Sequence, residues 1–176
     1  MKKYLLFFAL FGVVALLSSM LTPAEKIGYC NVEYIMAYYP ANQQAQQSLA
    51  NFRADLKSQM EGKYQVFQSK VEEMNKLTES DPARAEALQL ELQKLQSEIV
   101  TMEADSKTQI AKKEQDLFDP VFANVQQAID QVAAVNGFSF ILNSSDGATS
   151  IVLHAPEANN VNNLILKSLG APIPGE

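Results

Sequence analysis

Residues that carry chemistry are scarce in this sequence. Its 176 residues include one cysteine, one histidine and no tryptophan. Because Cys30 has no second cysteine to pair with, an internal disulfide is excluded, and we expect a small buried apolar side chain. His154 stands without the cysteines or clustered carboxylates that a metal site or an activated nucleophile needs, so we predict a structural role for it.

Glycine is also sparse, at seven residues, and no G-x-x-x-x-G-K-[S/T] or G-x-G-x-x-G run is present to hold a nucleotide phosphate. The polar run at residues 144–147 is explained by the chemistry of a hairpin turn more simply than by a catalytic loop. We therefore predict no catalytic, cofactor-binding or metal-binding residue and no cofactor, and we expect that the chain is not an enzyme.

Basic residues are outnumbered by acidic ones. The chain has 14 lysines and arginines against 20 aspartates and glutamates, which gives a net charge of −6. Proteins that bind nucleic acid favour a basic face, so nucleic acid is not an expected partner.

The longest apolar run lies at the N-terminus. Two lysines precede an uncharged stretch, residues 4–17, and small residues follow up to Ala24. This is the layout of a secretory signal peptide, and the run is shorter than the about 20 residues that a membrane anchor needs. We expect residues 1–24 to be cleaved on export. The mature chain then carries a net charge of −8, because two lysines and no acidic residue are removed.

The middle of the chain, residues 42–136, is predicted to be helical. It is rich in Gln, Glu, Lys, Ala and Leu and holds one glycine and two prolines. Apolar residues recur there with the spacing of a coiled-coil seam, about 3.5 residues. The predicted arm seam consists of Leu49, Phe52, Leu56, Met60, Tyr64, Phe67, Val71 and Met74, followed by Leu88, Leu92, Leu95 and Ile99.

The two halves of this seam are separated by a turn. Asp81-Pro82 is typical of a turn followed by a helix start. Two long helices joined by so few residues must run antiparallel, so residues 42–119 are predicted to form a helical-hairpin arm with its tip near residues 78–83. The seam thins after Met102, and we expect a kink or break at Asp119-Pro120, where the arm ends.

Both ends of the chain carry short strand patterns. Residues 26–30 are predicted to form a strand, followed by a short helix that Asn31 caps. Residues 138–142 and 150–154 are predicted to form two further strands joined by a turn, and residues 158–169 an amphipathic helix.

A helical hairpin brings these ends together, so residues 25–41 and 120–170 are predicted to build one small body, followed by a flexible tail, residues 171–176. The expected fold class is α+β, mostly α: a long antiparallel helical hairpin, the coiled-coil arm, projecting from a small β-sheet body that oligomerises.

A body of this size has little core relative to its surface, and its open sheet edges favour pairing with another copy. We therefore expect a homo-oligomer. Alternatively, or in addition, the same residues pack on the C-terminal helix. The predicted oligomer interface consists of Ile27, Tyr29, Phe138, Phe140, Ile151 and Leu153.

Several arms on a shared body would enclose a space for a non-native chain. Confinement and weak multivalent contacts would hold that chain without ATP. Where the seam is weakest, Met102 and Ile110 are the predicted contacts for a bound client.

The stretch KIGYCNVEYIMAYYPANQQAQQSL resembles the opening of the Skp/OmpH family of periplasmic chaperones, with its strand, its short helix led by asparagine and its first arm helix. The ending, from VQQAIDQVAAVNGFSFILNSSD to NNVNNLILKSLG, is similar to the return helix, strand pair and final helix of that family. The resemblance covers nearly all of the mature chain.

This resemblance implies a homotrimer with a β-barrel-like body and arms around a cavity. It also implies a periplasmic holding chaperone that binds unfolded outer-membrane proteins and prevents their aggregation. The best-known members are basic, whereas residues 79–84 here hold two acids and one arginine, which argues against membrane-surface binding through the tip. The alternative is a structural coiled-coil adaptor or spacer in the cell envelope with a fixed folded partner.

Overall fold

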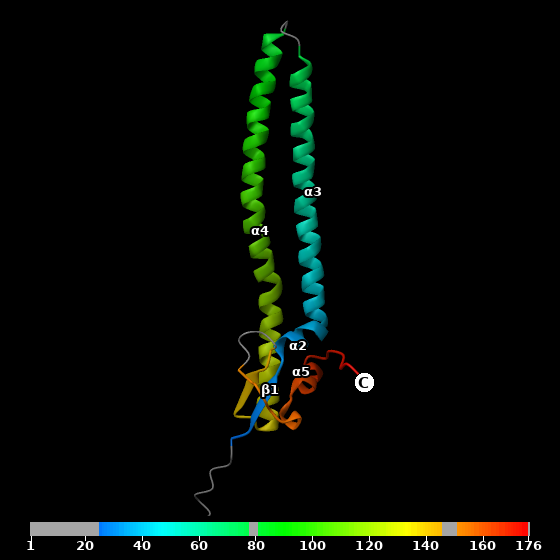
Figure 1. Ribbon diagram of the computed structural model, residues 1–176, viewed down its shortest axis with the longest axis vertical. Helices are drawn as coiled ribbons and strands as arrows, with labels where there is room; N and C mark the ends of the chain where they lie inside the picture. Colours follow the sequence, from blue (N-terminus) through cyan, green and yellow to red (C-terminus); the bar gives the residue numbers. More distant parts are fainter. Residues whose placement is uncertain (1–24, 78–80, 146–150, 176) are drawn as a thin grey trace, which may run out of the picture.

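The computed structural model describes residues 25–77, 81–145 and 151–175, so the predicted signal peptide lies outside the described residues. Two long helices, α3 (Pro40–Lys76) and α4 (Pro82–Asn136), run side by side as a slender rod, and the two ends of the chain meet at its base (Figure 1). The predicted helical-hairpin arm on a small body is therefore confirmed. We call the paired parts of α3 and α4 the arm.

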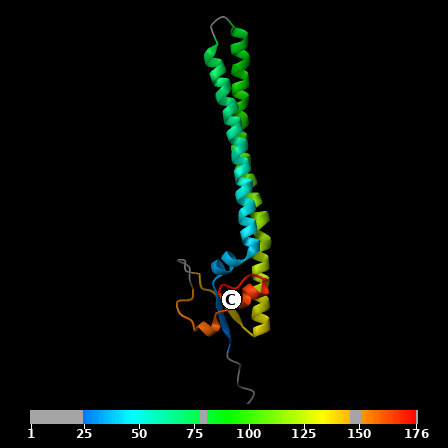
Figure 2. The ribbon, with the colours of Figure 1, turned by 90° about the vertical axis from the view of Figure 1, so that its right-hand side faces the viewer.

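The body consists of the lower end of α4 and the short elements around it. These are β1 (Ile27–Cys30), α2 (Val32–Tyr38), β2 (Phe140–Asn143), a 3-10 turn η1 (Glu157–Asn159) and α5 (Asn162–Ser168). In the turned view the segment 151–160, drawn in orange, lies on the side of β1 away from α4 (Figure 2).

Local sequence signals fix where the helices begin and end. Asn31 caps α2, because its side-chain oxygen accepts a hydrogen bond from the backbone N–H of Tyr34 at 2.9 Å. Asp81 caps α4 in the same way, accepting from the N–H of Arg84 at 3.1 Å, and Pro82 occupies the first turn. At the other end of α4, Gly137 adopts a left-handed conformation with φ 68° and ends the helix.

The break expected at Asp119-Pro120 does not form. Helix α4 runs through Pro120 as one helix of 55 residues. Proline removes one N–H from the helical ladder, which leaves the carbonyl of Asp116 without its usual partner. Both residues are exposed to solvent, so water can satisfy that carbonyl. Buried Val121 and Val125 hold the next turns against the body.

Within the described residues the sheet has two strands, whereas three were expected. β1 and β2 pair in parallel, with Ile27 opposite Phe140 and Cys30 opposite Asn143. The strand predicted for residues 150–154 is absent from the described residues 151–154, and residue 150 lies outside them. The free edge of β1 is contacted by Asn160 at Tyr29, and the N–H of Val161 donates to the Tyr29 carbonyl at 3.0 Å. At Tyr29 the edge of β1 is therefore occupied by residues 160 and 161 and not by residues 151–154.

The core lies in the body, between the sheet, α2, α5 and the lower turns of α4. Ile35, Ile165 and Leu166 have no exposed surface, and Val161 and Cys30 are nearly as deeply buried. The predicted flexible tail contributes to this core, because Ala171 is buried and Ile173 packs against the cluster. Contact with the core thus continues past the end of α5, up to residue 173.

Candidate interaction surfaces

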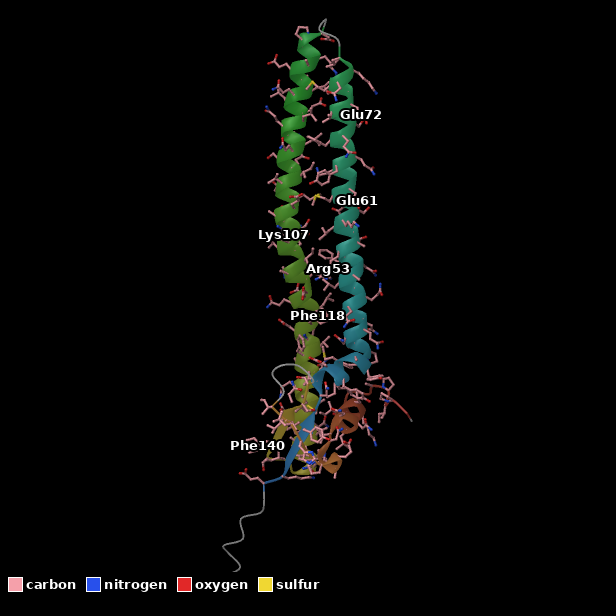
Figure 3. All side chains as sticks on the ribbon, in the orientation of Figure 1. Arg53, Glu61, Glu72, Lys107, Phe118 and Phe140 are labelled. Carbon is pink, nitrogen blue, oxygen red and sulfur yellow. The ribbon has the colours of Figure 1, made fainter. Side chains whose placement is uncertain are left out.

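Most residues of the predicted seam are buried or half-buried along the arm. Side chains from α3 and α4 point toward each other between the two helices (Figure 3). Leu49, Leu56, Leu88 and Ile99 are buried, and the other seam residues are half-buried, with the exception of Tyr64. Only a narrow stripe of each helix is covered, so the remaining faces of the arm are exposed to solvent.

Tyr64 lies at the edge of the seam and is 41% exposed. Its hydroxyl donates a hydrogen bond to the Glu103 carboxylate across the arm, at 2.7 Å. That hydrogen bond raises the pKa of Tyr64 above its usual value, because it stabilises the protonated phenol.

Ion pairs flank the seam and join the two helices. Arg53 pairs with Glu114 at 3.2 Å, and Lys70 pairs with Glu91 at 2.9 Å. Lys63 bonds to Glu98, and this hydrogen bond lowers the pKa of the Glu98 carboxyl. Near the tip, the guanidinium of Arg84 bonds to Glu73 and lowers the pKa of that carboxyl in the same way.

A groove interrupts the arm about midway along it. It has a volume of about 420 Å³ and lies between Phe52 and Leu56 of α3 and Met102 and Ser106 of α4. Met102, one of the two predicted client contacts, lines this groove. The other, Ile110, is half-buried further toward the body and does not line it.

Sequence reasoning missed Ser106 as a member of the seam. The residue is 8% exposed and sits where the heptad spacing from Ile99 calls for an apolar side chain. The heptad spacing alone predicts a buried residue at position 106, but a serine is polar and therefore does not count as an apolar seam residue.

The second surface lies on the body, where most residues of the predicted oligomer interface are found. Ile151 is 73% exposed and Leu153 is 94% exposed. Ile27 and Phe140 are also exposed, and Phe140 is labelled at the edge of the body in Figure 3. Such large exposed apolar side chains close together are typical of an interface between proteins.

Ile27, Tyr29, Ile151 and Leu153 together line a groove of about 470 Å³ on this surface. The Tyr29 hydroxyl donates to the Glu157 carboxylate at 3.1 Å. Burial of the phenol and the neighbouring Glu157 both raise the pKa of Tyr29. We call the exposed and groove-lining residues Ile27, Tyr29, Phe140, Ile151 and Leu153 the body surface.

Unlike the other residues of the predicted oligomer interface, Phe138 packs inside the chain. It is buried, and its ring lies 3.1 Å from the position that a Cβ atom at Gly28 would occupy. The ammonium of Lys26 lies 4.1 Å from the ring centroid, close enough for a cation–π interaction. Any side chain at residue 28 would therefore press against Phe138.

The remaining chemistry-bearing residues are unreactive or isolated. Cys30 is buried as expected, and burial raises the pKa of its thiol to about 11, so the thiol is protonated at neutral pH. His154 lines the body groove. Within residues 25–77, 81–145 and 151–175 no group of three His, Cys, Asp or Glu side chains could hold a metal ion. No helix in the same ranges is long and apolar enough to cross a bilayer.

Comparison with known proteins places the chain in a family. Residues 26–169 match the family described as outer membrane protein (OmpH-like). The chain belongs to the OmpH-like family. The match begins just before β1 and ends after α5, so it includes the arm and the body together. A comparison with curated proteins finds no match.

The same architecture is found in a solved structure. An OmpH-like protein from Caulobacter crescentus CB15, described as an outer membrane chaperone, superimposes with a TM-score of 0.65. The two sequences are 13% identical, and the match covers 84% of this chain and 86% of the other. This likeness shows that the two chains share the fold of an arm on a small body.

Proposed function

We propose that this protein is an ATP-independent periplasmic holding chaperone for unfolded outer-membrane proteins. In this proposal several copies, three by resemblance to the family, associate through their bodies. Their arms then surround a cavity in which one non-native chain is kept away from others. Residues 1–24 serve as the cleaved signal peptide that takes the chain to the periplasm.

The observation that supports this proposal is that an OmpH-like chain has two separate surfaces. One, on the body, would join copies of the chain, and the other, on the arm, would contact a client. At one end, Ile151 and Leu153 expose large apolar side chains on the body, as expected of a contact between copies. At the other, an arm about 55 Å long, from the 37 residues of α3, offers a long wetted surface for weak contacts. Many weak contacts hold a client without fixing its conformation.

Suppression of aggregation tests the proposal directly. The mature protein is mixed, without ATP, with an outer-membrane β-barrel protein diluted from urea, and light scattering is followed. We expect scattering to fall as the chaperone approaches a stoichiometric amount. Undiminished scattering at that amount would contradict the proposed function.

A pull-down from cell envelopes separates this function from the alternative adaptor or spacer. A holding chaperone recovers many different outer-membrane proteins in substoichiometric amounts. An adaptor recovers one folded partner at a fixed ratio, and that result would replace the proposal.

A further inference from the structure

The fold of the arm does not by itself require the groove that lies midway along it. A seam of uninterrupted large apolar residues would close the space between α3 and α4. Here a pocket of about 420 Å³ is open instead, next to Ser106. The ion pairs Lys63–Glu98 and Arg53–Glu114 join the helices on either side of it, so the two helices are held together above and below the opening.

Ser106 is the reason that the space is open. Its side chain is much smaller than leucine, and it lines the groove together with Phe52 and Leu56 of α3. The serine is 8% exposed, and its hydroxyl has no hydrogen-bond partner among the described residues. An unpartnered buried hydroxyl costs free energy until a partner is supplied. Stability of the empty arm therefore does not explain a serine at this position.

The walls and the rim of the groove have different chemistry. Phe52, Leu56 and Met102 supply apolar walls. At the rim, Lys63 is already bonded to Glu98, whereas Asp105 forms no ion pair within the described part of the chain. Among the charged residues that line the groove, Asp105 is therefore the one without an ion pair, and it lies beside an apolar recess.

We propose that this groove is a defined client-binding site, which rests on the proposed chaperone function. It accepts one large apolar side chain from an unfolded segment that also carries a lysine or arginine close by. The apolar side chain enters between Leu56 and Met102, and the cationic side chain meets Asp105. A carbonyl of the client backbone then accepts a hydrogen bond from Ser106 once that hydroxyl turns toward the groove.

Binding of a short labelled peptide tests this site separately from the capacity to prevent aggregation. The probe is a fluorescein-labelled peptide of glycine, serine and threonine with a central phenylalanine flanked by lysine. Fluorescence anisotropy measures its affinity for the mature protein. A second peptide with glutamine in place of lysine tests the role of charge.

Two substitutions in the groove and one beside it are compared. Ser106→Leu fills the recess, and we expect a loss of affinity for the lysine peptide of about tenfold. Asp105→Asn should abolish the preference for lysine over glutamine while leaving the recess open. Thr108→Leu is the matched control, because it adds the same side chain to an exposed position of α4 that does not line the groove, and it should bind as the unsubstituted protein does.

The outcomes are distinguishable. Equal affinity of the unsubstituted protein, Ser106→Leu and Asp105→Asn would overturn the groove as a client site, even if the protein still prevents aggregation. A change in oligomeric state with Ser106→Leu, at unchanged peptide affinity, would assign the groove to a second copy and would also overturn it. Circular dichroism and thermal unfolding check that each variant retains its helices. Failure of the unsubstituted protein to prevent aggregation would instead refute the proposed function.

Discussion

Leu88 and Leu90 lie two residues apart on α4 and have opposite environments. Leu88 is fully buried between the helices near the tip of the arm, whereas Leu90 is 61% exposed. Substituting each of them separates the contribution of the seam to stability from that of helix propensity. The same residue type occurs at both positions of the same helix, so the change in helix propensity is the same.

We expect Leu88→Ala to lower the free energy of unfolding by about 2–5 kcal/mol, because it removes apolar contacts and leaves a cavity. Leu90→Ala should change it by less than about 0.5 kcal/mol, because an exposed leucine loses little when truncated. Urea denaturation followed by circular dichroism measures both. Similar losses for the two variants would show that the seam is not paired at Leu88.

At the scale of an element, the arm depends on charge as well as on its seam. The pKa of Glu73 and that of Glu98 lie below the ordinary carboxyl value of 4.5, because Arg84 and Lys63 bond to the ionised carboxylates. A carboxyl whose pKa is lowered by folding adds to the free energy of unfolding. This contribution is complete at a pH above the pKa of the carboxyl in the unfolded chain. It is lost as the pH falls through the lower pKa of the folded state.

We therefore expect the Tm of the mature protein to fall between neutral pH and about pH 3, and Glu98→Gln to reduce that fall. Glu86→Gln is the control, since Glu86 is exposed and has no ion pair among the described residues. High salt should weaken the difference, because these pairs are partly exposed to solvent. The same pH dependence in Glu98→Gln and the unsubstituted protein would contradict a role for the Lys63–Glu98 pair.

Elements whose signals are local were predictable from the sequence. The asparagine cap at residue 31, the helix start at Asp81-Pro82 and the periodicity of the arm each depend on neighbours in the chain, and the structure confirms them. The pairing of β1 with β2 followed from the hairpin geometry, because antiparallel helices return the chain to its starting point.

Features that depend on distant contacts were not predictable. Residues 150–154 have the β-branched and apolar side chains of a strand, but no strand forms in the described residues 151–154, and Asn160 and Val161 contact Tyr29 on the edge of β1. Pro120 has the chemistry of a break, but packing of the following valines keeps the helix intact. Phe138 was predicted to lie at the oligomer interface and is instead buried in the core, where Gly28 leaves room for its ring. The groove at Ser106 likewise depends on what faces it across the arm.

At the scale of the whole molecule, one chain combines a long arm with a small body that exposes apolar side chains. The core of the body is small, and the body surface leaves Leu153 almost entirely exposed. A single copy therefore keeps apolar area in water that a second copy would cover, which favours association. The proposed function depends on this association, because a single arm cannot surround a client.

Sedimentation velocity of the mature protein, residues 25–176, shows whether copies of the chain associate. We expect a homo-oligomer of three copies, and Leu153→Asp should shift it toward monomer because a charge would be buried in the contact. Leu90→Asp, on the exposed face of the arm, should leave the oligomer unchanged. An unsubstituted protein that sediments as a monomer at micromolar concentration would contradict the account.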